Sequence, residues 1–139
     1  MKYGFIGLGN MAGAIISGMA ASGKFTGDSI YGYNRSEGKT VALKDKCGLI
    51  PCSSATEVVN AAEVVILSVK PQVMPTVLSE ISHLLTPDKT VISLAAGKPT
   101  SWYEEKLPAG DPLVRVMPNL AATVKMAVSA LCGGKSATE

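Results

Sequence analysis

Three small residues near the amino terminus have the spacing of a phosphate-binding turn. Gly7, Gly9 and Ala12 form the pattern G-x-G-x-x-A, which follows an apolar stretch and precedes a helical pattern. Gly7 would permit a tight turn, Gly9 would let backbone approach a pyrophosphate, and Ala12 would let the helix lie close to the strand. A helix that begins near Asn10 adds free N–H groups and the positive end of its dipole. Small residues also occur in ordinary tight strand–helix contacts, but this context favours a dinucleotide site. The residues expected to form it are Ile6, Gly7, Leu8, Gly9, Asn10, Met11 and Ala12.

A second group of residues bears on which dinucleotide would bind. Asn34, Arg35 and Ser36 follow the next apolar stretch, roughly 20 residues after the glycine pattern, where an Asp or Glu would hold the ribose hydroxyls of NAD. No carboxylate is present at these three positions. An arginine and a hydroxyl instead suit a ribose 2′-phosphate, and Lys39 could add charge one turn later. The alternative is that Arg35 is only a solvated surface residue. The sequence favours NADP(H) over NAD(H).

Three later segments offer further candidates, each directly after an apolar stretch. Lys70 could face the cofactor or could only cap a strand end in solvent. The small residues at 95–97 would let backbone come near a flat nicotinamide ring, or would only turn the chain. Asn119 offers one amide near the expected reaction centre, and it is the single candidate for a catalytic role. The full set is Ser68, Val69, Lys70, Pro71, Ala95, Ala96, Gly97 and Asn119.

The usual catalytic constellations are missing from the sequence. The only histidine, His83, falls within an expected helix and far in sequence from every strand end. No Ser–His–Asp set and no metal-ligand cluster can be assembled from the residue types and spacings. This lack fits a reaction whose chemistry the cofactor carries, with the protein supplying position. We therefore expect no metal.

Strand and helix patterns alternate along the chain. Strands are expected at residues 2–6, 29–33, 47–50, 63–69, 90–94 and 113–116, with at most one more at 128–131. Helices are expected from about residue 10 to 22, at 38–46, 54–61 and 73–85, and at a Ser101-x-x-Glu104 capping box. Such alternation predicts an α/β fold with a doubly wound parallel sheet, the Rossmann NAD(P)-binding fold, of about six strands. Ligands of such sheets lie outside the carboxyl ends of the strands.

Composition sets the outer limits of these expectations. The 139 residues suit one domain, and 47% hydrophobic against 17% charged residues is the profile of a compact fold. The 13 Lys and Arg residues are scattered and the net charge is +2, so neither nucleic acid nor an anionic membrane is expected as a partner. Three cysteines without close C-x-x-C spacing indicate reduced thiols in a cytoplasmic protein. Glycines interrupt the amino-terminal apolar stretch, which argues against a secretory signal, and no run reaches the roughly 18 apolar residues of a membrane span.

The motifs, taken in order, resemble those of the pyrroline-5-carboxylate reductases. The shared stretches are GFIGLGNM, NRS, VKPQ, AAG, RVMPN and SALC, and together they cover the chain from Lys2 to about Gly134. The resemblance implies the last step of proline synthesis, in which NADPH gives hydride to the C=N carbon of 1-pyrroline-5-carboxylate. It also implies that residues 6–11 cradle the pyrophosphate, 34–36 take the adenosine end, 68–71 line the middle of the cofactor, and 95–97 with Asn119 lie by the nicotinamide.

Two departures from the family pattern qualify this interpretation. The family usually follows Met-Pro-Asn with Thr-Pro near the substrate, whereas this chain has Leu120-Ala121. Family members also continue into an all-helical domain that forms a homodimer and supplies much of the substrate pocket. We therefore expect a cofactor-binding domain at residues 1–134, with 135–139 as a tail or the start of a linker, and little activity for this chain alone. The alternatives are another imine or β-hydroxyacid reductase domain, or a free-standing NADP(H)-binding module.

Overall fold

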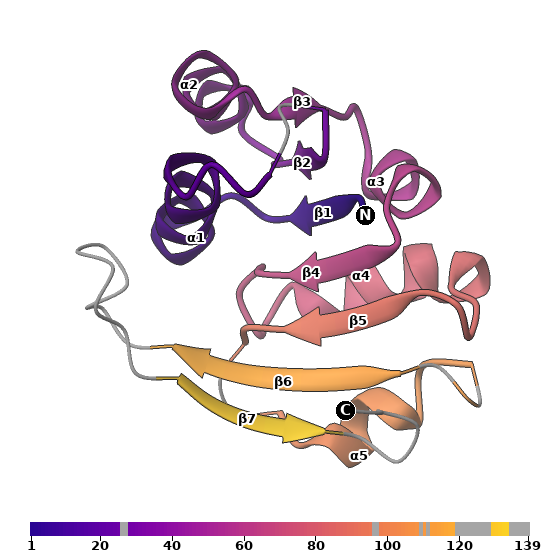
Figure 1. The fold of residues 1–139 in the computed structure, drawn as a ribbon. Coiled ribbons are helices and arrows are strands. Elements are labelled where there is room, and N and C mark those ends of the chain that lie inside the picture. The colour runs from indigo at the N-terminus through magenta and orange to yellow at the C-terminus, as the bar shows by residue number, and fades with distance from the viewer. Residues whose placement is uncertain (26–27, 96–97, 109, 111, 119–128, 134–139) are drawn as a thin grey trace.

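A seven-stranded sheet forms the centre of the fold (Figure 1). The structure is a computed structural model that describes residues 1–25, 28–95, 98–108, 110, 112–118 and 129–133. The strands lie in the order β3-β2-β1-β4-β5-β6-β7, in which neighbours from β3 to β6 are parallel and β7 is antiparallel to β6. Their bounds are β1 Tyr3–Ile6, β2 Ile30–Tyr33, β3 Ile50–Pro51, β4 Val64–Leu67, β5 Thr90–Ser93, β6 Leu113–Pro118 and β7 Ser129–Gly133.

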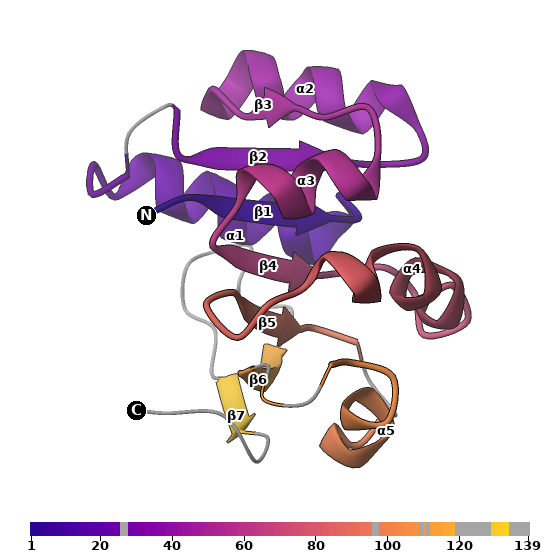
Figure 2. The same ribbon diagram turned by 90° about the vertical axis from the view of Figure 1, so that its right-hand side faces the viewer.

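Helices cover both faces of the sheet. They are α1 Asn10–Ala21, α2 Glu37–Cys47, α3 Ala55–Ala61, α4 Met74–Ile81 with the short 3₁₀ turn η1 Ser82–Leu84, and α5 Thr100–Glu104. In Figure 2, α3 lies in front of β1 and β2, whereas α1 passes behind them. The predicted doubly wound α/β fold is thus confirmed, with the possible extra strand present as β7.

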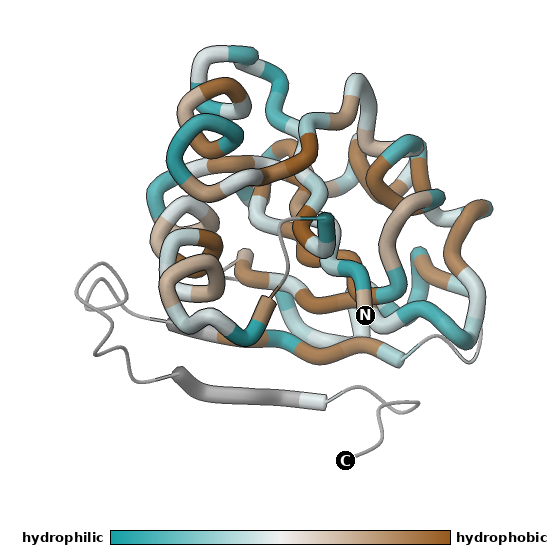
Figure 3. Tube along the Cα trace, turned by 45° about the horizontal axis from the view of Figure 1, so that its top comes forward, coloured by the Kyte–Doolittle hydropathy of each residue, from teal (hydrophilic) through white to brown (hydrophobic). Residues whose placement is uncertain are grey.

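The buried residues form two hydrophobic clusters, one on each face of the sheet. On β4, Val65 and Leu67 join the cluster that includes α3, α4 and α5, while Val64 and Ile66 join the cluster that includes α1. A strand buried on both faces needs apolar residues throughout, which is why this stretch reads as a continuous apolar run. Figure 3 shows hydrophobic stretches along the central strands and hydrophilic stretches on the outer turns.

The carboxyl ends of four strands form one aligned row. Ile6 at the end of β1 pairs in register with Tyr33 on β2 and with Leu67 on β4, and Leu67 pairs with Ser93 on β5. The loops that follow these strands therefore start side by side. This alignment brings the segments after residues 6, 33, 67 and 93 to one edge of the sheet, as the fold prediction requires.

Three local expectations need correction. The Ser101-x-x-Glu104 capping box is wrong, because α5 begins at Thr100 with Pro99 at its N-cap and no side-chain cap. Val73 precedes α4 and is 41% exposed, so Met74, Val77, Leu78 and Ile81 form the core-facing side instead. The third strand is only two residues long and begins at Ile50. Of the described helices, none is long and apolar enough to cross a membrane.

Candidate functional site

Gly7 is required by the fold itself. It follows β1 with a φ of +93°, a backbone conformation that L side chains rarely adopt. Its N–H donates to the Tyr33 carbonyl at 2.8 Å. A Cβ at this position would lie 2.9 Å from the backbone carbonyl of Ser68. The predicted tight turn at Gly7 is confirmed, and the close approach of β4 is the reason for it.

Gly9 has no such reason within the described chain. Its φ is −73°, and a Cβ built there would meet no atom within 4 Å. Gly9 is the N-cap of α1, and no side chain caps that helix end. A helix N-terminus without a side-chain cap leaves backbone N–H groups free for an anion. The space that a side chain would fill is open, which fits a ligand that comes close to the backbone.

Leu8 and Ala12 are instead buried in the hydrophobic core. Leu8 is 2% exposed and Ala12 is fully buried, and both belong to the cluster between α1 and the sheet. The full burial of Ala12 between α1 and the sheet fits its small size. Packing of α1 on the sheet thus accounts for Ala12 but not for Gly9.

Asn34 ties two loops of the site together. Its Oδ1 accepts from the Leu8 N–H at 2.9 Å, and its Nδ2 donates to the Ser36 carbonyl at 3.0 Å. The amide thus joins the glycine turn after β1 to the loop after β2. Arg35, which lies between Asn34 and Ser36 in the sequence, is exposed. The sequence predicted Asn34 as a direct cofactor contact, and that contact stays a prediction. The structure shows a positioning role that sequence spacing did not reveal.

Ser68 makes a similar tie on the other side of β1. Its hydroxyl donates to the carbonyls of Gly7 and Ile6, and its N–H donates to the Ile6 carbonyl at 2.9 Å. The glycine turn is therefore held by side chains from both neighbouring strand ends. A turn held in this way needs little ordering when a ligand binds.

A cavity of about 550 Å³ opens beside the glycine turn. Among the described residues that line it, three are cationic (Arg35, Lys39 and Lys70) and one, Glu80, is a carboxylate. This balance suits an anionic ligand. Predicted site residues in the lining are Ile6, Gly7, Leu8, Gly9, Asn34, Arg35, Ser68, Val69 and Lys70. The lining also includes residues outside the predicted set, namely Tyr33, Ala55, Val73, Thr76, Val77 and Glu80.

The apolar side of this cavity comes from the start of α4. Val73 is exposed there, and Val69 and Val77 line the same cavity. Val73 follows the end of β4 by six residues, and nothing in its sequence context marks it as exposed. The valine spacing instead suggested a core position, because Val77 and Ile81 do face the core.

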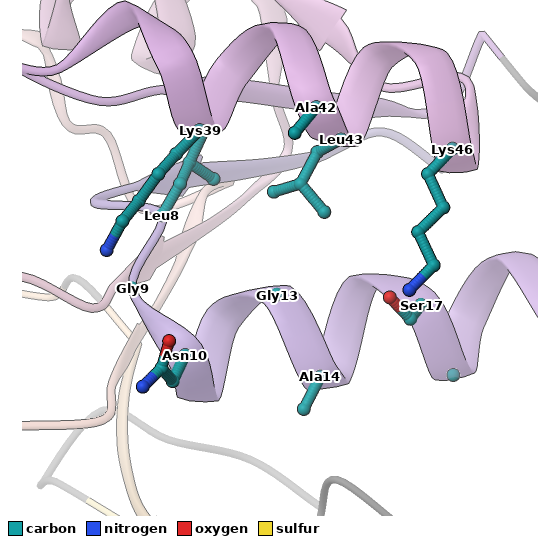
Figure 4. A pocket seen from close by; sticks show the side chains of 11 residues that line it. Leu8, Gly9, Asn10, Gly13, Ala14, Ser17, Lys39, Ala42, Leu43 and Lys46 are labelled. Carbon is teal, nitrogen blue, oxygen red and sulfur yellow. The ribbon is translucent and has the colours of Figure 1, made fainter.

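A second groove, of about 470 Å³, runs between α1 and α2 from the same starting point (Figure 4). Gly9, Asn10, Gly13 and Ser17 line it on α1, and Lys39 extends from α2 past Leu8 at the Gly9 end. Lys39 belongs to both hollows. Its ammonium group therefore lies at the N-terminal end of α1, where Gly9 is the N-cap.

Several predicted site residues fall elsewhere. Pro71 and Ser36 are not among the residues that line the larger cavity. Ala95 is 5% exposed and follows the end of β5. Ala96, Gly97 and Asn119 lie outside the described residues. The aligned row of strand ends thus brings together the adenosine-side and pyrophosphate-side candidates.

The Cys52 thiol has no reactive environment. Burial, with the charge of Glu57, raises the pKa of Cys52 to about 11, so this thiol stays protonated near neutral pH. Glu57 accepts from the N–H and hydroxyl of Ser53, which lowers the pKa of that carboxyl. Within the described ranges, no three His, Cys, Asp or Glu side chains gather as metal ligands. His83 is exposed in η1.

Comparison with known proteins agrees with this geometry. Residues 2–97 match the protein family described as NADP oxidoreductase, coenzyme F420-dependent. The chain belongs to this family. Within it, the chain is homologous to the amino-terminal NADP-binding domain of pyrroline-5-carboxylate reductases.

Individual relatives show how much of such a reductase the chain represents. The pyrroline-5-carboxylate reductase of Methanosarcina acetivorans is 41% identical over 137 residues, which are 99% of this chain and 51% of the relative. The structure of a pyrroline-5-carboxylate reductase from Coxiella burnetii has a TM-score of 0.94 at 33% identity, covering 99% of this chain and 51% of that one. The Plasmodium falciparum pyrroline carboxylate reductase structure with NADP bound gives 0.87 at 28% identity, with 99% and 50% covered. The chain thus spans about half the length of the curated relatives it matches.

Proposed function

We propose that this chain is the NADP(H)-binding domain of a pyrroline-5-carboxylate reductase. The observation that carries the proposal is Gly9, which begins α1 without a side-chain cap and opens onto a cavity lined by Arg35 and Lys39. A pyrophosphate would lie against the backbone N–H groups that begin α1. When bound, the nicotinamide supplies the hydride that reduces the C=N carbon of 1-pyrroline-5-carboxylate to give proline.

The adenosine end would lie over the loop after β2. Arg35 offers a planar guanidinium to the ribose 2′-phosphate, Ser36 a hydroxyl and Lys39 an ammonium group. Val69 and Val73 form the apolar wall of the same cavity, which suits the adenine ring. Asn34 holds the two loops at a fixed separation through Leu8 and Ser36.

The reaction centre would lie beyond β5 and β6. Ala95, Ala96, Gly97 and Asn119 follow those strands, and we assign them to the nicotinamide side, with Asn119 as the candidate catalytic group. Residues 1–134 form the cofactor domain in this proposal, and 135–139 begin the linker to a helical domain. That second domain would complete the substrate pocket and form a homo-oligomer.

Calorimetric titration of the chain with NADPH tests the proposal, with three glycine variants as comparisons. Gly9→Ala is expected to weaken NADPH binding about tenfold or more, because its methyl group enters the ligand space, while the melting temperature without ligand changes little. Gly7→Ala is expected to lower the free energy of unfolding by at least about 2 kcal/mol, because of its positive φ and the Ser68 backbone.

Gly18→Ala is the matched control. Gly18 lies on α1, the helix that Gly9 caps, and a Cβ at Gly18 also meets nothing within 4 Å. It lines the second groove at the end away from Gly9 but does not line the larger cavity, so NADPH binding there should be unchanged. If the Gly9→Ala protein binds NADPH as tightly as the unmodified chain, cofactor binding does not explain why a glycine stands at this position.

A further inference from the structure

Two hydroxyl groups are buried together at the carboxyl end of β5. Ser93, the last residue of the strand, is 1% exposed, and Tyr103 on α5 is fully buried. Their oxygens lie 2.6 Å apart, so one hydroxyl donates to the other. Burying hydroxyls in an apolar core costs free energy unless they bond to each other or to backbone. This pair is therefore a fixed element of the core.

The hydroxyl pair also bonds to the backbone that follows β5. The Leu94 N–H still donates to the Leu67 carbonyl at 2.9 Å, which continues the sheet. At the next residue the pairing changes, because the Ala95 N–H donates to Ser93 Oγ at 3.3 Å. Ser93 thus holds the first residue that departs from the sheet. Its own side chain is held by Tyr103.

Two features fix the Tyr103 hydroxyl as a hydrogen-bond partner of Ser93. The ring of Trp102 meets its ring edge to face, with centroids 5.0 Å apart. Burial raises the pKa of the Tyr103 phenol, so the hydroxyl stays neutral near neutral pH and keeps its hydrogen for bonding. The chain of contacts runs from α5 through Tyr103 and Ser93 to the Ala95 backbone.

We infer that Tyr103 is a positioning residue for the nicotinamide side of the cofactor site, acting through Ser93 on the backbone at Ala95. The inference rests on the proposed function, which assigns the segment after β5 to the nicotinamide. The glycine turn and the loop after β2, on the other side of the proposed site, are held by different residues, Ser68 and Asn34. Loss of the hydroxyl pair should therefore affect one half of the cofactor and spare the other.

The test compares two ligands on the 139-residue chain by calorimetric titration. NADPH carries both halves, whereas adenosine 2′,5′-bisphosphate carries only the adenosine half. Tyr103→Phe keeps the ring and removes the hydroxyl, and it is expected to weaken NADPH binding about fivefold while leaving the affinity for the bisphosphate unchanged. Fluorescence of bound NADPH, which arises from the nicotinamide, should change in the same variant.

Two further variants separate positioning from general stability. Ser93→Ala should reproduce the NADPH effect, and the double variant should be no worse than the more severe single variant, because both act through one contact. Tyr31→Phe removes a hydroxyl from a half-buried tyrosine on β2, outside the cavity lining, and should leave both affinities unchanged.

The outcomes distinguish this inference from the proposed function. An unmodified chain that binds neither ligand overturns both. An unmodified chain that binds both, with Tyr103→Phe and Ser93→Ala weakening both ligands equally or neither, overturns the positioning role alone. Weakened NADPH binding with unchanged bisphosphate binding supports it.

Discussion

The 139-residue chain is expected to bind NADPH but to oxidise it with 1-pyrroline-5-carboxylate at least about 10⁵-fold more slowly than a full-length reductase. Holding the imine carbon against the nicotinamide contributes about 7–11 kcal/mol of barrier lowering, which corresponds to about that factor or more. The chain spans only half of its curated relatives. Binding the cofactor supplies one half of the required geometry.

Two described cations lie near the end of β5. Arg115 on β6 pairs in register with Ser93, and Lys98 follows β5 with its Nζ 4.6 Å from the centre of the Trp102 ring. Lys70 and Lys39 line the cavity beside the glycine turn. Because the relatives are about twice as long as this chain, we expect further donors to the substrate carboxylate to come from their additional half.

The assay follows NADPH oxidation with synthetic 1-pyrroline-5-carboxylate. It compares this chain with the full-length Methanosarcina acetivorans relative and with this chain extended by any coding sequence that follows it. Calorimetry on the same preparation verifies that NADPH is bound. Turnover by the 139-residue chain at a rate comparable to the full-length enzyme would mean that the substrate site is complete within these residues.

Arg35→Asp is expected to abolish or reverse the preference for NADPH. A guanidinium–phosphate pair is worth about 1.5–3 kcal/mol, so the unmodified chain should bind NADPH on the order of ten- to a hundredfold more tightly than NADH. An aspartate repels the 2′-phosphate and can accept from the ribose hydroxyls of NADH. Because Arg35 is exposed, added salt should narrow the preference of the unmodified protein.

Titration of both cofactors into both proteins, at low and high salt, checks this expectation. Lys44→Asp is the matched control, because it makes the same charge change on α2 and Lys44 does not line the cavity. The control should keep its preference for NADPH. Equal affinities of the unmodified chain for NADPH and NADH would contradict the role given to Arg35.

Local backbone demands explain which features were predictable from sequence. The pattern of Gly7, Gly9 and Ala12 is contained in six residues, and its spacing predicted the turn and the start of α1, although the backbone that faces Gly7 belongs to the distant Ser68. The apolar run of β4 likewise predicted a strand buried on both faces. These signals are contained in short windows of the chain.

Contacts between distant segments were not predictable in the same way. The bond between Leu8 and Asn34 joins residues 26 apart in sequence, and it depends on the register of β1 with β2. The hydroxyl pair of Ser93 and Tyr103 depends on where α5 returns to the sheet. Val73 was misplaced because helical spacing does not say where a helix begins.

The tie made by Asn34 has a consequence for how cofactor preference can change during evolution or by engineering. Because its amide already fixes the separation between the glycine turn and the loop after β2, the neighbouring Arg35 side chain is exposed and free of that duty. Substitutions at Arg35 and Lys39 can alter charge without rebuilding the loop, whereas substitutions at Asn34 would release it. The framework thus separates a constant anchor from variable specificity positions, and a library that varies the latter alone samples cofactor choice at little risk to folding.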